Sequence, residues 1–478
     1  MLLRVIGWLL CIEAVFMIAP CIVGFIYGEH SGLKFLICIG ITLGAGLSMV
    51  SLKPKSRDMG KREAIILTGL TWVVLSAFGM LPFLLCGTHI SVTDAFFENM
   101  SGFTTTGASV LDTLHNVPHS ILLWRCVEQW IGGLGIILFT LAVLPMLNYQ
   151  GGMQLFNAEV TGITHDKLRP RVSFTAQSLW LVYLILTLIC IGLLCFSELD
   201  FFEAVCYGLS TMSTGGFATQ DASISELGNL YIKIILIIFM FMGGVNFSLL
   251  YKFVTGHFKE FFRNEVIRCY IILIIIFAVI LALNVWATGL MEDITDVTID
   301  PLFQTVSLFS STGLVEPDFY DWGALPVVLL VIMMLMGACA GSTSGGAKID
   351  RFIVLYKFIK NEFYKLMHPN AITTVTLNGK GTPPPILLKT LAFLFLYIAV
   401  IVFGGTILAI IGLPLKDSLF IALSAVSNTG LGTDITGING NFALIPDIAK
   451  WLISFLMLVG RLELFTILIL FFPSFWRK

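Results

Sequence analysis

Four short segments rich in hydroxyl groups recur along this chain of 478 residues, and each ends in a glycine. In every copy a serine stands six positions before the glycine, and a second hydroxylated residue stands three positions before it. The four segments are Ser101-Gly-Phe-Thr-Thr-Thr-Gly107, Ser210-Thr-Met-Ser-Thr-Gly-Gly216, Ser307-Leu-Phe-Ser-Ser-Thr-Gly313 and Ser424-Ala-Val-Ser-Asn-Thr-Gly430. One such segment is typical of a polar turn, but four in one register indicate an internal repeat.

The backbone carbonyls and hydroxyls of these segments have the chemistry of a cation site. Neutral oxygens can replace part of a cation's hydration shell, and glycine permits backbone geometry that a side chain would block. We therefore predict that the three residues closing each segment line one ion path. These residues are Thr105, Thr106 and Gly107; Thr214, Gly215 and Gly216; Ser311, Thr312 and Gly313; and Asn428, Thr429 and Gly430.

Acidic residues flank each segment on both sides. Thirteen positions before the glycine stand Asp94, Glu203, Asp300 and Asp417, and four or five positions after it stand Asp112, Asp221, Asp318 and Asp434. We expect each preceding acid to cap a short helix whose last turn holds the repeated serine, with direct ion contact as the alternative. We expect the following acids to ring the mouth of the path and to concentrate cations there. A merely solvated face is the alternative for these four.

The elements that position the segments are expected to be membrane helices. Hydrophobic residues make up 57% of the chain and charged residues 12%, which excludes an ordinary soluble domain. A span needs about 20 mainly apolar residues. The sequence predicts ten spans, near residues 3–27, 33–52, 64–87, 118–147, 174–196, 226–256, 266–289, 322–364 with an interruption, 385–412 and 445–474. Each glycine segment follows a run too short to span, which predicts a re-entrant pore helix.

The basic residues predict the orientation of these spans. If the N-terminus is cytoplasmic, 22 of the 28 Lys and Arg residues fall on the cytoplasmic side, and the four glycine segments fall on the other side. Lys and Arg favour cytoplasmic loops, so both termini are expected in the cytoplasm.

The ten cysteines lie almost all within apolar runs and the seven histidines form no cluster with metal-ligand spacing.

The expected fold class is therefore an all-α polytopic membrane protein with four units around one pore. Each unit has a helix, a pore helix, an extended segment and a second helix, and all units point the same way, unlike inverted transporter repeats. A two-helix addition at residues 1–55 precedes the units, which cover residues 56–160, 161–262, 263–375 and 376–478. The second helix of the third unit is interrupted.

The interruption is a run of eleven small residues from Gly337 to Ala347, followed by Lys348. Such a run has poor helix propensity and is expected to unwind within the membrane. A nucleotide-binding loop is excluded because Ala347 precedes Lys348 and Ile349 follows it, whereas close helix packing by small residues remains an alternative. The candidate gate residues here are Gly337, Gly341, Ser342, Gly345, Gly346 and Lys348.

Arg461 lies in the middle of the last predicted span. A charge at this depth is costly and usually faces a bundle interior or a water path. Pairing with Glu463 or Glu128 is the alternative, although Glu463 is only two residues away and points to another face. We expect Arg461 and the 337–347 loop jointly to limit ion flux.

On these glycine segments, the small-residue run and Arg461, the chain resembles the Trk/Ktr/HKT superfamily of cation uptake proteins over about its whole length. The extra N-terminal helix pair makes it most similar to the bacterial Trk-type potassium translocating subunit. The resemblance implies a pseudo-fourfold pore with Gly107, Gly216, Gly313 and Gly430 as filter glycines. A serine at the first of these positions is associated with sodium preference in that family, so Gly107 implies potassium, with rubidium accepted. The resemblance also implies that the 337–347 loop obstructs the path below the filter, with Arg461 as an electrostatic barrier.

The resemblance further implies a homodimer in the bacterial inner membrane and a peripheral cytosolic subunit with nucleotide-binding domains of the RCK/KTN type. Potassium is the transported ion, and neither an organic cofactor nor nucleic acid is expected. Gly215 and Asn428 depart from the pattern of the other copies, which predicts weaker exclusion of sodium than in a tetrameric potassium channel. A proton- or sodium-coupled symporter is the first rival, and it needs titratable groups such as Glu128 or Glu463 in the path. A membrane enzyme is the second, but the sequence offers no active-site constellation of His, Asp or Glu.

Overall fold

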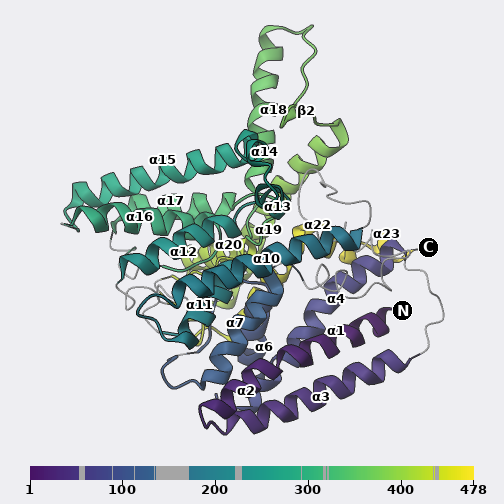
Figure 1. Ribbon diagram of the computed structural model, residues 1–478. Helices are drawn as coiled ribbons and strands as arrows, with labels where there is room; N and C mark the ends of the chain where they lie inside the picture. Colours follow the sequence, from purple (N-terminus) through teal and green to yellow (C-terminus); the bar gives the residue numbers. More distant parts are fainter. Residues whose placement is uncertain are drawn as a thin grey trace.

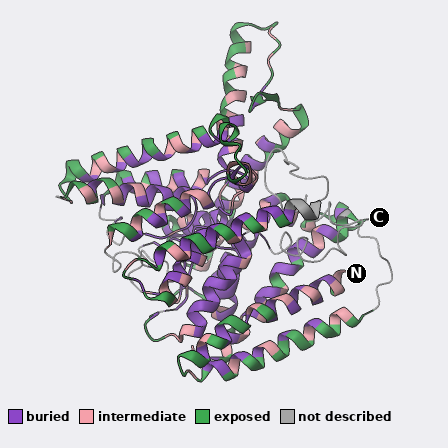
Figure 2. Ribbon diagram, viewed as in Figure 1, coloured by how far each residue is buried: buried purple, intermediate pink, exposed green. Residues whose placement is uncertain are grey.

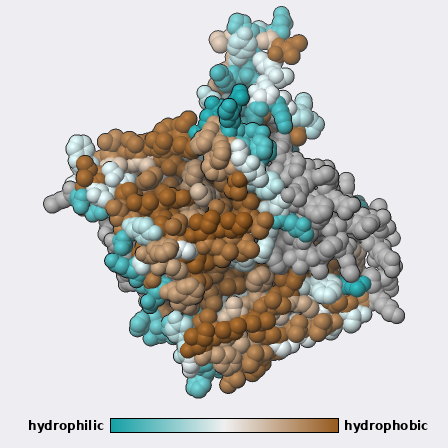
Figure 3. All heavy atoms as spheres, in the orientation of Figure 1, coloured by the Kyte–Doolittle hydropathy of each residue, from teal (hydrophilic) through white to brown (hydrophobic). Residues whose placement is uncertain are grey.

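In the computed structural model the protein is a bundle of long helices arranged around shorter ones (Figure 1). The structure describes residues 1–52, 60–88, 90–111, 113–133, 135, 172–220, 229–291, 293–315, 319, 322–433, 435–436 and 441–477. Figure 2 shows that buried residues concentrate at the centre, on α6 and α7, whereas α3 and α15 at the periphery carry exposed residues along their length. Because the exposed side chains of the outer helices are largely apolar, the bundle has the surface of a protein surrounded by lipid (Figure 3).

The N-terminal addition is a pair of antiparallel helical segments. Its first arm consists of α1 (Leu2–Phe16) and α2 (Ile18–Ile26), and its second arm is α3 (Ser31–Ser51). The arms approach closely where glycines face each other, because a Cβ on Gly7 would lie 2.7 Å from the carbonyl oxygen of Gly46. Such small-residue contacts are a common means of packing helices in lipid.

Four groups of helices follow this pair. The first contains α4 (Lys61–Gly79), α5 (Leu81–Leu85), α6 (Val92–Phe103) and α7 (His119–Gly133), and the second contains α10 (Val172–Leu194), α11 (Phe201–Ser213), α12 (Leu230–Gly243) and α13 (Phe247–Val254). The third contains α15 (Glu265–Thr288), α16 (Ile294–Phe309), α17 (Ala324–Met336) and α18 (Ile349–Met367), and the fourth contains α19 (Pro384–Ile411), α20 (Leu415–Ser427), α21 (Asp447–Arg461), α22 (Glu463–Leu468) and the 3₁₀ turn η4 (Ile469–Phe471). The boundaries proposed for the four units stay a prediction.

Most predicted spans have a direct counterpart. Within the described residues, six stretches are long and apolar enough to cross a membrane as one segment, and two more are helix pairs bent by 110° and 113°. The bent pairs are α12 with α13 and α21 with α22. The remaining two predicted spans correspond to the shorter α17 and to α7, whose predicted continuation to residue 147 lies largely outside the described residues.

The short helices α6, α11, α16 and α20 precede the four glycine segments. They have 12 to 16 residues, too few to span, and their last turns are buried. Two of them begin at side-chain caps: Ser91 accepts a hydrogen bond from the backbone N–H of Asp94, and Asp293 accepts one from that of Thr295. The repeated serines lie in the last turns, as the spacing predicts.

One polar projection was not predicted as such. It comprises the outer part of α18, the six-residue helix α14 (Phe258–Arg263) and a hairpin of β1 (Thr376–Leu377) and β2 (Lys380–Gly381). The strands are antiparallel, with Thr376 opposite Gly381 and Leu377 opposite Lys380. Figure 1 shows α18 and the hairpin extending beyond the bundle, and a four-residue helix α23 (Pro473–Trp476) lies on the same side of the bundle as the N-terminus.

Candidate functional site

The four glycine segments share one backbone conformation. Two positions before each glycine the chain has a left-handed φ of 52° to 54°, at Thr105, Thr214, Ser311 and Asn428. The glycines themselves have φ of 74° to 85°, at Gly107, Gly216, Gly313 and Gly430. In each copy the N–H just before the glycine donates to the carbonyl of the repeated serine over 2.9 to 3.0 Å, so this serine shapes the segment through its backbone. Four sequences with little else in common therefore end their pore helices in the same way.

The segments also touch one another in cyclic order. A Cβ added to any of these four glycines would lie 1.9 to 2.3 Å from the carbonyl oxygen that precedes the glycine of the next segment, so a side chain there requires the neighbouring backbone to shift. The contacts run from Gly107 to Gly215, from Gly216 to Thr312, from Gly313 to Thr429, and from Gly430 back to Thr106. The four candidate segments thus form a closed ring of backbone within one chain.

Hydroxyl pairs brace three of the four segments. Thr104 Oγ1 lies 2.8 Å from Thr106 Oγ1, and the matching separations are 2.7 Å at Ser310 and Thr312 and 2.9 Å at Ser427 and Thr429. These hydroxyls hydrogen bond to each other, which leaves the backbone carbonyls as the oxygens best suited to an ion.

The second segment replaces the hydroxyl pair with a side chain from a neighbouring helix. Gln129 of α7 donates from Nε2 to the carbonyl of Gly215 at 2.7 Å. Its Oε1 accepts from Ser210 Oγ at 2.9 Å and from the N–H of Phe217 at 3.2 Å. A Cβ at Gly215 would strike this amide, so the departure of the second copy from threonine has a structural cause.

Asn428 stands in the fourth copy where the other three copies have a threonine or a serine, and the structure gives a reason for it. Asparagine tolerates the left-handed conformation that this position requires. Its Nδ2 donates to Thr106 Oγ1 and to the carbonyl of Met457, both at 3.0 Å. The side chain therefore links the fourth segment to the first at the point where the ring closes.

A buried ion pair supports the outer ends of the first two segments. Glu98 of α6 and Arg125 of α7 lie 2.8 Å apart and are at most 2% exposed. Glu98 accepts from Ser109 Oγ at 3.0 Å and from the N–H of Val110 at 2.8 Å. Arg125 covers the ring of Phe217 at 4.0 Å, so the pair fixes the chain just after both Gly107 and Gly216.

The acids that precede the segments are not the helix caps that we expected. Asp94, Glu203 and Asp417 lie in the first turns of their helices, whereas the N-cap positions belong to Ser91, Asp200 and Pro414. Asp300 lies well inside α16, because that helix begins earlier, at Ile294. Capping is therefore the wrong interpretation. Instead Asp94 pairs with Lys450 at 2.6 Å and Asp300 with Lys233 at 2.7 Å, each across a boundary between helix groups.

Asp112, Asp221, Asp318 and Asp434, the acids that follow the glycines, lie outside the described residues. Their expected place around a mouth stays a prediction.

The small-residue run is non-helical, as predicted, and its middle lies against the ends of the pore helices. Gly345 donates its N–H to Ser311 Oγ at 2.5 Å, and a Cβ on it would meet the backbone of Ser427. Thr343 Oγ1 lies 3.2 Å from Thr214 Oγ1 and 3.0 Å from the carbonyl of Gly243. One loop therefore touches the second, third and fourth segments.

The base of the loop is fixed by the bend between α12 and α13. Gly341 accepts a hydrogen bond from the N–H of Phe247 at 2.9 Å, and Asn246 Nδ2 donates to the carbonyl of Ala340 at 2.7 Å. Gly337 and Gly346, with φ of 64° and 77°, pass close to each other where the loop leaves and rejoins its helices. Ser342 Oγ donates to the carbonyl of Cys339 at 2.6 Å within the loop.

Arg461 binds backbone carbonyls, and not the carboxylate of Glu463 or Glu128 that was the alternative. Its guanidinium donates to Thr343 at 2.7 Å, to Gly132 at 2.5 Å and to Gly133 at 2.7 Å. Glu463 instead pairs with Arg351 at 2.5 Å, and Glu128 accepts a hydrogen bond from Asn99. Arg461 thereby joins the loop to the end of α7.

Lys348 is the other candidate cation below the segments, and it is 3% exposed. Its ammonium group donates to the carbonyl of Ser344 and, at 3.2 Å, to the hydroxyl of the same residue. Together Lys348 and Arg461 place two basic side chains against the 337–347 loop.

Comparison with known proteins shows the family to which this chain belongs. The model of the TrkH family, described as cation transport protein, matches residues 34–478. The chain belongs to the TrkH family. Family members are cation transporters rather than enzymes, so the enzyme alternative is excluded.

Relatives of this TrkH-family chain match over nearly full length. They include the Trk system potassium uptake protein TrkH of Salmonella typhimurium, 36% identical over 99% of each chain, and TrkG of Escherichia coli, 32% identical over 99% of this chain and 97% of the relative. The crystal structure of the potassium transporter TrkH from Vibrio parahaemolyticus matches with a TM-score of 0.89 at 32% identity, covering 100% of this chain and 99% of that one. The resemblance and the all-α polytopic fold predicted from the sequence are confirmed.

Several residues of this TrkH-family site escaped the sequence analysis. These are Glu98, Arg125 and Gln129. The one feature of the sequence that could have pointed to them is that they are polar residues within short, mainly apolar helices. A second missed feature is a glycine in the helix that follows a glycine segment. A Cβ on Gly132 of α7 would strike the carbonyl oxygen of Phe103, and a Cβ on Gly460 of α21 would strike that of Val426. That signal is visible once the second helices are compared with each other.

Proposed function

We propose that this protein takes up potassium, and accepts rubidium, through a gated pore formed by a single chain. The observation that carries the proposal is the closed ring of four backbone segments, each at the C-terminal end of a buried pore helix. Carbonyl oxygens held in a ring can substitute for water around a monovalent cation. The negative ends of four short helices directed at that place add attraction for cations and repel anions.

Potassium is the proposed ion on two grounds. The printed names of the relatives describe potassium uptake proteins. In addition, Gly107 is glycine, whereas the resemblance to the Trk/Ktr/HKT superfamily associates a serine at this position with sodium preference. The bracing by Gln129 and Asn428 makes the ring unequal around its circumference, which is the reason to expect weaker sodium exclusion than in a symmetric channel.

The proposed gate is the 337–347 loop together with Arg461 and Lys348. The loop lies against three of the four segments, and Arg461 connects it to the helix of the remaining unit. A cation leaving the ring toward the loop therefore meets the guanidinium group of Arg461 and the amino group of Lys348. Opening requires the loop to move, and we assign control of that movement to a cytosolic nucleotide-binding subunit that docks on the basic face of the molecule.

The same proposal places the protein in the bacterial inner membrane with both termini in the cytoplasm, as a homodimer. The charge distribution along the sequence supports this orientation, since most Lys and Arg residues fall on one side.

Coupled symport is the second candidate, and one observation favours it. Glu13 and Glu128 are almost completely buried, and both oxygens of Glu13 and Oε2 of Glu128 have no hydrogen-bond partner among the described residues. Both side chains lie near Asn99 of the first pore helix. Acidic side chains buried within a membrane span are candidate members of a proton pathway. A proton-coupled mechanism predicts acidification-driven uptake that disappears in Glu128→Gln.

The test is radioactive rubidium uptake into proteoliposomes that contain the purified full chain. Potassium should compete much more strongly than sodium, whereas choline should not compete. In Gly107→Ser the advantage of potassium over sodium should fall by about tenfold, equivalent to about 1.4 kcal/mol. Gly192→Ser is the matched control, because no atom lies within 4 Å of a Cβ at that position. Equal competition by sodium in the unmodified protein would refute the potassium assignment, and unchanged selectivity in Gly107→Ser would refute the filter assignment.

A further inference from the structure

An open pocket of about 850 Å³ lies on the side of the molecule that carries both termini. The side follows from the order of the spans, because α15 starts where α13 and α14 end, after an even number of crossings. The walls are α14, the start of α15, α18 and the hairpin of β1 and β2. None of these residues belongs to the ion path.

Hydrogen bonds between its walls show that the pocket is a built feature of the fold. Asn378, at the turn of the hairpin, accepts from the N–H of Glu265 at 2.7 Å and donates its own N–H to that carboxylate at 3.2 Å. Lys357 of α18 pairs with Glu265 and donates to the carbonyl of Thr376 at 2.8 Å. The hairpin, α15 and α18 are therefore held together around the pocket.

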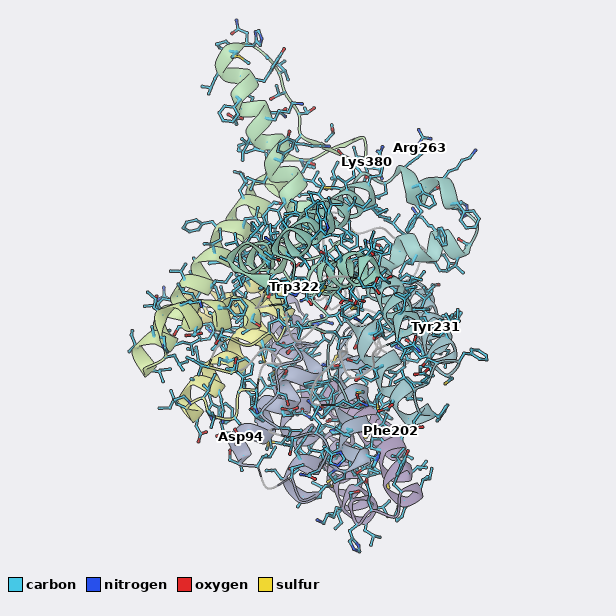
Figure 4. The ribbon with its side chains drawn as sticks, turned by 90° about the vertical axis from the view of Figure 1, so that its left-hand side faces the viewer. Asp94, Phe202, Tyr231, Arg263, Trp322 and Lys380 are labelled. Carbon is cyan, nitrogen blue, oxygen red and sulfur yellow. The ribbon has the colours of Figure 1, made fainter. Side chains whose placement is uncertain are left out.

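The lining is strongly basic. Five basic side chains and two acidic ones line the pocket, which leaves a formal excess of three positive charges. Two of the basic groups are engaged, since Lys357 pairs with Glu265 and Lys252 lies 3.2 Å from Glu260. Arg263, Arg268 and Lys380 supply the excess, and Figure 4 shows Arg263 and Lys380 near each other at one end of the molecule.

Apolar rings beside the pocket indicate where it lies relative to lipid. α14 exposes Phe258 and Phe262, which are 53% and 59% accessible, while Phe261 between them is buried. This short helix immediately precedes the span that starts at Glu265. Exposed aromatic rings next to basic residues at the end of a span are typical of the membrane interface, where the rings enter the acyl region and the charges face the headgroups.

We infer that this pocket binds the phosphate group of an anionic phospholipid. The guanidinium groups of Arg263 and Arg268 and the ammonium group of Lys380 would contact the phosphate oxygens, since guanidinium groups match such oxygens in pairs. The acyl chains would run beside Phe258 and Phe262. A basic pocket at the inner end of membrane helices is a recurrent form of lipid headgroup site. The bound lipid would join the hairpin and α18 to the start of α15.

Native mass spectrometry of the purified full chain, titrated with phosphatidylglycerol or phosphatidylcholine, tests the inference. Each basic residue near an anionic headgroup contributes a factor of about five in affinity, so Arg263→Gln/Lys380→Gln should weaken phosphatidylglycerol binding about 30-fold. The matched control is Lys259→Gln/Lys360→Gln, which removes two exposed charges from α14 and α18, two walls of the pocket, without changing a lining residue. The control should bind phosphatidylglycerol as the unmodified chain does.

A second arm separates a lipid from a soluble phosphate compound. Millimolar inorganic phosphate should leave the phosphatidylglycerol adduct in place, because phosphate alone lacks the contacts with the aromatic rings. If phosphatidylcholine binds as well as phosphatidylglycerol, or if both double variants lose affinity equally, the headgroup assignment is overturned. If inorganic phosphate displaces the lipid, the pocket is a soluble-phosphate site and the lipid assignment is likewise overturned.

Discussion

Glycine is favoured at each of the four proposed filter positions for two reasons, and both concern the Cβ atom that glycine lacks. Its φ is positive, and the place of its missing Cβ is occupied by a carbonyl oxygen of the next segment. At Thr105, Thr214, Ser311 and Asn428 the φ is also positive, but a side chain is present. These four positions carry a conformational cost of order 1 kcal/mol each, which the surrounding hydrogen bonds offset. In the proposed filter, carbonyls held in this way would not have to reorient when an ion arrives.

The buried pair of Glu98 and Arg125 is predicted to be the main determinant of rigidity in the first segment. Arg125→Gln leaves a charged carboxylate without its partner, at a cost of about 3–5 kcal/mol. We expect a clear drop in the thermal unfolding temperature of the detergent-solubilised protein. Glu98→Gln/Arg125→Gln should recover much of the loss, because no buried charge remains. Equal destabilisation of the single and double variants would contradict the electrostatic role.

Arg461 is predicted to restrict flux. In Arg461→Ala the loop loses one hydrogen bond and the path loses a positive charge, so rubidium uptake should rise by about tenfold in the absence of any partner subunit. Arg461→Lys keeps the charge and serves as the comparison, and its uptake should stay near that of the unmodified protein. Flux that is the same in all three proteins would show that Arg461 has no part in the gate.

At the scale of elements, the spans were predictable because lipid imposes a length and an apolar surface on any helix that crosses it. The short pore helices followed from the same rule, as runs too short to cross. The loop at 337–347 followed from helix propensity, since eleven small residues cannot maintain a helix without packing.

The tertiary contacts of the same elements could not be predicted in this way. Gln129 and Asn428 act on other units, so their roles depend on which helices become neighbours. The acids thirteen positions before the glycines were wrongly predicted to be N-caps, because the cap is the residue at which the backbone leaves the helical conformation, and the sequence repeat does not show where that happens. The helix α16, for example, starts earlier than the repeat suggests. The hairpin at residues 376–381 is too short to give a strand pattern.

The turn between α2 and α3 is predicted to give a pH-dependent contribution to stability. Burial tends to raise the pKa of Glu29, but hydrogen bonds from Ser31, His119 and Ser120 outweigh it and lower the pKa below its ordinary value of 4.5. Its stabilising effect is therefore complete above pH 4.5 and is lost as the pH falls through the lowered value.

Glu29→Gln should reduce the free energy of unfolding at pH 7 by on the order of 1–3 kcal/mol and should flatten the acid limb of a plot of unfolding temperature against pH. Glu63→Gln, at the start of α4, is the comparison variant. If Glu29→Gln retains the same acid limb as the unmodified chain, other groups are responsible.

At the scale of the whole molecule, the order of spans predicts which side each surface faces. Cys195 follows α10 and is exposed, at the end of the span opposite to the termini. A membrane-impermeant maleimide added to right-side-out vesicles should therefore label Cys195. Labelling should disappear in Cys195→Ser, since eight of the other nine cysteines are buried and Cys269 is half-buried within α15. Labelling only in inverted vesicles would reverse the proposed orientation.

The closure of the ring within one polypeptide has a genetic consequence. In a channel built from four identical chains, one altered codon changes four equivalent positions at once. Here one codon changes a quarter of the circumference, and the other three quarters keep their geometry. Two quarters already differ from the rest. Gln129 contacts Gly215 in the second quarter, and Asn428 of the fourth quarter contacts Thr106. If this ring is the filter, as proposed, ion preference can change in small steps, one quadrant at a time, through intermediates that retain most of the ring.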